Sequence, residues 1–222
     1  GLTATLVVYV LAQATYTHLN QAAWANPVLW SVVMLASLLT LSGVDYPTYF
    51  SGAQFIHFLL GPAVVALAWP LWERRHALAQ RWRGLLLAAL LGGAAASGSA
   101  LLLGWLAGLP QDVVLSLAPK SVTAPVAMGI ADRIGGIPAL AAVFAVVTGM
   151  VGALSGKLVF DLLGVTKDRA GWMIHGFALG TAAHGIGAAR ALQVNGTAGA
   201  YAGLALGLQV LLAALLIPLM FN

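Results

Sequence analysis

Two stretches of the sequence combine residue types and spacing that could do chemistry. The first is Leu-Ala-Pro-Lys-Ser-Val-Thr-Ala-Pro, in which Lys120 lies between Pro119 and Pro125. Prolines inside an apolar stretch predict a broken helix, because each removes a backbone donor and clashes with the preceding turn. A helix N-terminus carries positive partial charge, Lys120 adds a full charge, and the Ser121 and Thr123 hydroxyls both donate and accept. We predict binding of a small carboxylate with a hydroxyl or keto neighbour; alternatively, Lys120 extends to the membrane interface and the hydroxyls bond backbone carbonyls.

The second stretch is Gly-Thr-Ala-Ala-His-Gly-Ile-Gly-Ala-Ala-Arg, which ends at Arg190. On a continuous helix His184 and Arg190 would point about 120° apart, but Gly185 and Gly187 favour a break that lets them converge. An arginine can hold a carboxylate with two hydrogen bonds, and a histidine can exchange a proton near neutral pH. We predict that these four residues contribute to substrate binding. The alternative is a buried histidine that bonds a neighbouring helix and an arginine that faces lipid headgroups.

Three further polar residues could line a cavity. Gln54 and His57 lie one turn apart in an apolar segment, where packing is the simpler interpretation. Asn26 precedes Pro27, a pattern typical of a helix start, and could also reach a substrate. The acidic residues all fall at segment ends, and no metal cluster, Ser–His pair or paired carboxylates are evident in the sequence. We therefore expect no enzyme, no cofactor and no bound metal.

The composition indicates whether the protein is surrounded by water or by lipid. Of 222 residues, 61% are hydrophobic and 7% are charged, and the mean hydropathy is +0.94. A chain this apolar cannot cover its surface with polar groups in water, so we expect an integral membrane protein. Nucleic acid binding is not expected despite the net charge of +4, because the basic residues form no continuous stripe.

Apolar segments near the length of a bilayer span divide the chain, since a spanning helix needs about 20 residues. There are eight: 2–19, 27–41, 53–72, 85–107, 113–131, 137–159, 172–192 and 200–221. Prolines interrupt two of them, 53–72 and 113–131. We predict an all-α polytopic membrane protein, a single domain over residues 1–222, with about six full transmembrane helices and two proline-broken or re-entrant segments.

Basic residues indicate the orientation of these segments. Residues 74–83 contain four arginines, and residues 161–171 contain Lys167 and Arg169, so both loops are expected on the cytoplasmic side. An even number of crossings must separate them, which makes 113–131 a re-entrant hairpin that turns between Pro119 and Pro125. The sequence around Pro62 and Ala63 is locally similar to the sequence around Pro119, and this similarity suggests an inverted repeat.

Four stretches carry a family resemblance: Pro-Ala-Val-Val-Ala-Leu-Ala-Trp-Pro-Leu from Pro62, the proline-flanked stretch from Pro119, Ile-Gly-Gly-Ile-Pro-Ala from Ile134 and His-Gly-Ile-Gly-Ala-Ala-Arg-Ala from His184. They resemble the LrgB/CidB family of bacterial membrane proteins. The C-terminal half of the plant plastidial glycolate/glycerate translocator is similar. The resemblance implies an inner-membrane protein, described as antiholin-like in cell lysis and associated with the movement of small organic acids. It also implies an LrgA-like small membrane partner.

The resemblance maps onto individual positions. Residues 119–123, including Val122, and Pro125 match the family's proline-flanked motif, and His184, Gly187 and Arg190 match its second motif. The sequence departs from the pattern at Ala124 and Ala188, where threonine is expected, and at Gln193, where an acidic residue is common. These departures remove two hydroxyls and, at Gln193, one carboxylate, but they leave the cationic centre intact.

The leading hypothesis is a secondary transporter of small monocarboxylates of the glycolate, glycerate or pyruvate type. Protons are the expected coupling ion, although backbone carbonyls could coordinate sodium, and the sequence contains no GxxxxGK[ST] loop for ATP. The alternative is an antiholin-like modulator of cell lysis that acts through membrane partners. We expect a homodimer, an LrgA-like partner and a location in the bacterial inner membrane.

Overall fold

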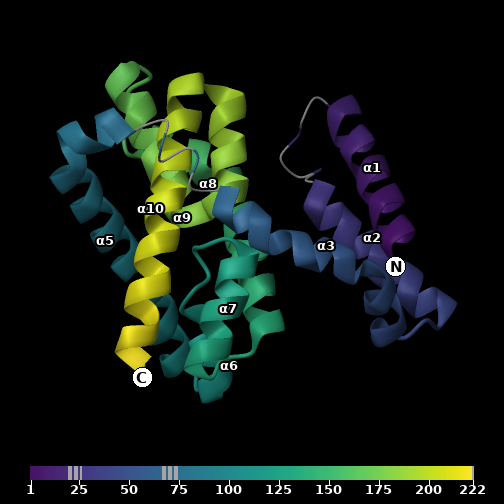
Figure 1. Ribbon diagram of the computed structural model, residues 1–222. Helices are drawn as coiled ribbons and strands as arrows, with labels where there is room; N and C mark the ends of the chain where they lie inside the picture. Colours follow the sequence, from purple (N-terminus) through teal and green to yellow (C-terminus); the bar gives the residue numbers. More distant parts are fainter. Residues whose placement is uncertain are drawn as a thin grey trace. The chain divides into compact units, whose positions relative to one another are not determined.

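The protein is all-helical in a computed structural model that describes residues 1–19, 22, 25, 27–66, 69, 72 and 75–221 (Figure 1). This confirms the expected fold class. The chain forms two compact units, Gly1–Val65 and Ala66–Asn222, and each is described by itself. The single transport domain expected from the sequence stays a prediction.

The first unit contains α1 (Leu2–His18), α2 (Pro27–Ser42) and α3 (Tyr46–Ala66). Helix α1 packs against α2. The hydroxyls of Thr5 and Tyr49 lie 2.7 Å apart and join α1 to α3. Helix α3 continues past Pro62, so the break expected at Pro62 and Ala63 is wrong within 46–66. The remainder of the expected segment, as far as residue 72, falls largely outside the described residues.

The second unit contains three helices that are long and apolar enough to cross a membrane, counted over the described residues. They are α5 (Arg75–Leu106, apolar from Ala79), α8 (Pro138–Leu162) and α10 (Gly196–Phe221). Helices of this length and hydropathy identify a membrane protein. The described ranges do not confirm the expected number of six full spans.

A broken hairpin connects α5 to α8. It consists of α6 (Gln111–Leu117), an irregular tip at 118–123 and α7 (Ala124–Ile134). After α7 the chain returns to the level of α6, because the Ile137 N–H donates to Ser116 Oγ over 2.7 Å. Gly135 makes this return possible with a left-handed φ of 81°. The predicted break between Pro119 and Pro125 is confirmed.

A second broken hairpin connects α8 to α10. The helix α9 (Arg169–Val194) is interrupted at Ala183 and His184, and its second half folds back along the first, so that Gly187 packs on the carbonyl of Leu179. The expectation that 172–192 forms one continuous crossing is wrong. Hydropathy alone cannot separate one long helix from two half-length helices, because both bury the same apolar residues.

The two hairpins approach the centre of the second unit from opposite ends. The first hairpin ends where α8 begins, and the second begins where α8 ends. A helix of 25 residues is about 37 Å long at 1.5 Å per residue, so these ends are far apart. The broken elements are therefore 111–134 and 169–194, and the inverted repeat expected around Pro62 is not confirmed.

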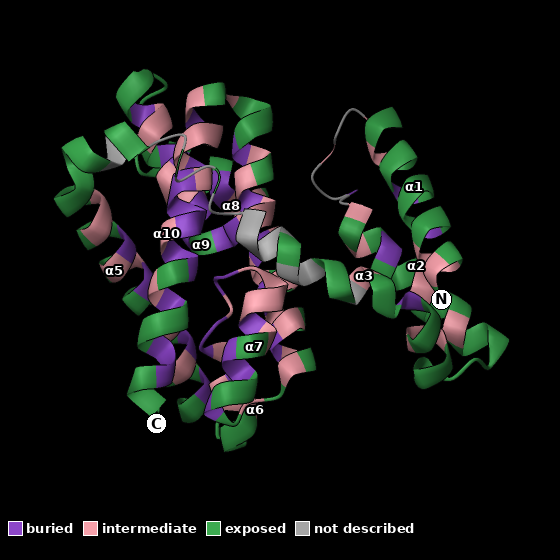
Figure 2. Cartoon of the chain, in the orientation of Figure 1, coloured by how far each residue is buried: buried purple, intermediate pink, exposed green. Residues whose placement is uncertain are grey.

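Glycines allow the second hairpin to pack closely on its neighbours. Gly152 and Gly156 on α8 face the first half of α9, and Gly149 faces the His184 ring at the break and Ile186 just after it. On α9 itself, Gly176 and Gly180 lie against the carbonyls of Ala198 and Ala202 of α10. This pairing also shows that the first half of α9 runs parallel to α10. These glycines therefore allow close helix packing, and the buried residues in Figure 2 concentrate where α7 to α10 meet.

Gly180→Ala is expected to destabilise the protein by about 1–3 kcal/mol, because the added methyl group would overlap the Ala202 carbonyl in a packed interior. Gly98→Ala is the matched control, since nothing lies within 4 Å of a Cβ at that position on α5. Alanine there should leave stability equal or raise it by up to about 1 kcal/mol. Thermal unfolding in detergent measures both variants, and equal destabilisation would contradict the close approach of α9 and α10.

Candidate functional site

The tip of the first hairpin holds Lys120 inside the unit. Ala118 and Val122 on either side of it are each 1% exposed. The Ser97 hydroxyl of α5 donates to the Ala118 carbonyl over 2.7 Å. This hydrogen bond gives a partner to a backbone carbonyl next to the break. The Lys120 ammonium donates only to Ser121 Oγ among the residues described, over 3.5 Å. Lys120 therefore offers a positive charge with no carboxylate of the described residues beside it.

Helix α7 begins at this tip. Thr123 occupies the N-cap position, but its hydroxyl makes no capping hydrogen bond. Pro125 fits the first turn of α7 because an N–H at that position would have no helical partner in any case. The remaining N–H groups of the first turn and the helix dipole give this end positive partial charge.

His184 forms the tip of the second hairpin in a strained conformation. Its φ is 41°, in the left-handed region that favours glycine, and its side chain is 3% exposed. The ring is held from α8, where Nε2 donates to the Ala145 carbonyl over 2.7 Å. A neutral imidazole with a proton on Nε2 leaves Nδ1 as an acceptor. Strain of this kind persists where the surrounding structure fixes it, often at a functional site.

The two tips meet in the interior of the unit. A Cβ built on Gly185 would lie 3.9 Å from Cγ2 of Thr123, which is ordinary contact distance. Thr123 occupies the N-cap position of α7, and Gly185 follows the break and begins the second half of α9. Two helix N-termini therefore lie against each other, with Lys120 and His184 on the two tips. Such an arrangement concentrates positive potential and suits an anion.

Three buried oxygen atoms have no hydrogen-bond partner among the described residues. They are Thr123 Oγ1, Thr181 Oγ1 and Gln209 Oε1. Thr181 precedes the α9 break by two residues, and Thr181 and Gln209 contact the adjacent glycines Gly92 and Gly93 of α5. Because a buried polar atom without a partner costs free energy, these atoms are candidates for contact with water, substrate or an ion.

Thr181 and Gln209 are not among the site residues expected from the sequence. A signal for Gln209 is present, because it is a polar residue in the middle of the 26-residue apolar helix α10. Ser97 and the Ala145 carbonyl are also additions from the structure, since no pattern in one sequence links them to the hairpin tips.

Several predicted site residues have other roles in the structure. Val122 belongs to the hydrophobic core of the second unit. Gly187 packs on the backbone of Leu179, so it closes the hairpin. Arg190 donates to Gln193 Oε1 over 3.4 Å in the second half of α9. Six residues separate it from His184, about 9 Å along a helix, and no described contact brings the two together.

The candidates in the first unit are placed less fully. Gln54 is exposed on α3, as is Pro62. His57 and Ala63 lie on α3, but their side chains are outside the described set, as is the whole of Asn26. Among the residues that the structure describes, no group of three or more His, Asp or Glu could hold a metal ion.

His184→Ala is expected to lower stability more than His184→Gly. Both changes remove the hydrogen bond to the Ala145 carbonyl, but glycine also relieves the left-handed backbone, which is worth about 1 kcal/mol or more. Thermal unfolding of the two variants in the same detergent measures the difference. If the alanine variant is the more stable, the break at residue 184 does not have the described geometry.

Comparison with known proteins places the chain in a family. The family model described as the LrgB-like family matches residues 5–222. An uncharacterized protein of Haemophilus influenzae is 35% identical over 197 residues, which cover 89% of this chain and 84% of that protein. No solved structure matches the chain.

Two proteins of Bacillus subtilis are also similar. The uncharacterized protein YxaC is 35% identical over 167 residues, 75% of this chain and 71% of that protein. The uncharacterized protein YwbG is 30% identical over 219 residues, 98% of this chain and 95% of that protein. The similarity to YwbG therefore includes both compact units.

Proposed function

This chain belongs to the LrgB-like family, and we propose that it is a secondary transporter of small monocarboxylates of the glycolate, glycerate or pyruvate type. The observation that carries the proposal is the meeting of two helix N-termini at Thr123 and Gly185. Broken helices that meet in this way bind the anionic group of a substrate in other transporters, because their unpaired N–H groups point into one cavity.

The side chains at the tips fit a carboxylate that has a polar neighbour. Lys120 supplies the full positive charge and has only the weak contact with Ser121 to give up. The Thr123 hydroxyl has no hydrogen-bond partner among the described residues and can bond a hydroxyl or keto oxygen of the substrate. Binding of a small, polar anion would thus give hydrogen-bond partners to the Lys120 ammonium and the Thr123 hydroxyl, and these new bonds favour such a substrate.

Protons are the coupling ion that the residues support best. His184 lies at the tip of the second hairpin, and its Nδ1 has no hydrogen bond among the described residues. An imidazole can take up and release a proton in the physiological pH range. Sodium is the second choice, because the backbone carbonyls at the two breaks could coordinate it. Measuring uptake under an imposed proton gradient and under an imposed sodium gradient distinguishes the two ions.

The antiholin-like function is the second candidate, in which the protein modulates cell lysis through membrane partners. The broadly apolar exposed surface of α5 supports it, since an LrgA-like protein or a second copy in a homodimer could pack there. It gives no role to Lys120, a lysine at a broken-helix tip with no carboxylate of the described residues beside it, so we rank it below transport. Both proposals place the protein in the bacterial inner membrane.

Lys120→Gln is expected to reduce saturable uptake of labelled glycolate, glycerate or pyruvate into proteoliposomes by at least about thirtyfold, because it removes the charge that faces the carboxylate. Lys120→Arg should retain part of the activity, since it keeps the charge with different geometry. Lys157→Gln is the control, because Lys157 is exposed on α8.

Insertion and thermal stability of each variant are measured alongside uptake. Uptake by Lys120→Gln equal to that of the unmodified protein would contradict the assignment of Lys120. An absence of uptake by correctly inserted, unmodified protein, with all substrates and both gradients, would favour the antiholin-like function or an obligatory LrgA-like partner.

Thr123→Val is expected to raise the KM for uptake about tenfold or more while it leaves thermal stability nearly unchanged. The Thr123 hydroxyl makes no hydrogen bond with the described residues, so valine removes no bond within them. It leaves the hydroxyl or keto oxygen of the bound substrate without a partner, which costs about 1–3 kcal/mol. Thr123→Ser keeps the hydroxyl and should keep the KM within a few fold. A KM that valine leaves unchanged would remove Thr123 from the site.

A further inference from the structure

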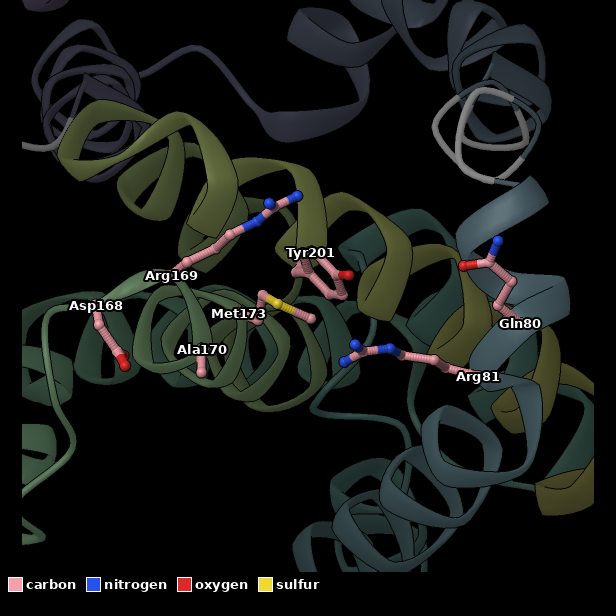
Figure 3. A pocket seen from close by; sticks show the side chains of 7 residues that line it. All are labelled: Gln80, Arg81, Asp168, Arg169, Ala170, Met173 and Tyr201. Carbon is pink, nitrogen blue, oxygen red and sulfur yellow. The ribbon is translucent and has the colours of Figure 1, made fainter.

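A pocket lined by two arginines lies at the end of the second unit where α5, α9 and α10 begin. It has a volume of about 580 Å³ and is open to the surface. Its lining includes Gln80 and Arg81 of α5, Asp168, Arg169 and Met173 at the start of α9, and Tyr201 of α10 (Figure 3). The hairpin tips lie deeper in the unit, so this pocket is separate from the proposed substrate site.

Two arginines give the pocket its charge. Arg81 has non-helical backbone angles (φ −125°, ψ 17°) that kink α5, and Figure 3 shows its side chain directed across the pocket toward Met173 and Tyr201. Arg169 is the first residue of α9. Neither guanidinium forms a hydrogen bond or ion pair with any residue that the structure describes. Two sets of donors are therefore available to a ligand.

The one carboxylate of the lining is already engaged. Asp168 Oδ1 accepts from Thr166 Oγ1 over 2.7 Å and from the Gly171 N–H over 2.8 Å, and so caps α9. These hydrogen bonds hold the pKa of Asp168 below its usual value, with the Thr166 hydroxyl the larger cause. Asp168 is thus ionised at neutral pH and serves the backbone, and the two arginines still leave the lining with a positive charge.

The backbone adds to this positive potential. The pocket includes the first turn of α9, the second turn of α10 and the point at which α5 resumes after its kink at Arg81. The first half of α9 runs parallel to α10, so both direct the positive ends of their dipoles to the same end of the unit. The arginines, the pocket and these helix ends together favour an anion of high charge density, such as a phosphate group.

We propose that this pocket binds the phosphate group of an anionic phospholipid. The depth supports a lipid, because the apolar part of α5 begins at Ala79 and α10 begins at Gly196, so the lining lies where headgroups lie. Trp82, which is 50% exposed, follows Arg81 on α5 and is typical of the headgroup region. Basic pockets between helices on the cytoplasmic side are suited to anionic headgroups. Free phosphate is the other source of the same chemistry.

Native mass spectrometry of the purified full chain in detergent tests the proposal. The probes are phosphatidylglycerol, phosphatidylcholine with the same acyl chains, and inorganic phosphate. Retention of phosphatidylglycerol should exceed that of phosphatidylcholine, and Arg81→Gln and Arg169→Gln should each weaken it about fivefold. Arg133→Gln is the control, because Arg133 is exposed at the end of α7, outside the pocket.

Equal retention of the two lipids, or an equal loss in Arg133→Gln, would overturn the proposal. Displacement of the lipid by millimolar inorganic phosphate would overturn the lipid source and identify a free anion as the ligand. Both arginines are exposed, so their replacement is not expected to unfold the protein, and thermal unfolding checks this. The lipid assay uses no transport substrate, so its outcome is independent of the proposed function.

Discussion

The need to satisfy backbone polar groups away from water governs the second unit. A broken helix leaves N–H and C=O groups without partners, and lipid offers none, so a break is stable only inside the protein. The first break lies among buried residues and takes a hydrogen bond from Ser97. The second is held by the hydrogen bond from His184 to the Ala145 carbonyl, which lies 39 residues away in the sequence. The remaining free groups at the two tips are those that a ligand can use.

Close helix packing is the condition for this arrangement. The glycines of α8 leave room for the His184 ring and for Ala183, and the glycines of α9 bring its backbone onto α10. Each larger residue at these positions would move a tip away from its neighbour. The abundance of glycine is therefore connected to function through geometry, although no glycine needs to touch a substrate.

Sequence reasoning succeeded where the cause of a feature is local. The break between Pro119 and Pro125 follows from proline itself, and Lys120 stands out because a charge inside an apolar segment is costly. The sequence did not predict features that depend on contacts between residues far apart in the chain. Pro62 does not interrupt α3, which continues to Ala66, because a proline inside a helix can kink the helix without ending it. The α9 break contains no proline, and the sequence allowed it at the glycines without showing that the chain reverses there.

The central claim is that the helix N-termini at Thr123 and Gly185 bind a small carboxylate. Amide NMR of labelled protein in lipid nanodiscs tests it directly, with glycolate, glycerate and pyruvate as ligands and their neutral methyl esters as controls. The account predicts saturable shifts of the Ala124 and Gly185 amides with at least one of the acids and no such shifts with its ester. Amide shifts that are absent with all three acids, or that are the same with acid and ester, would contradict it.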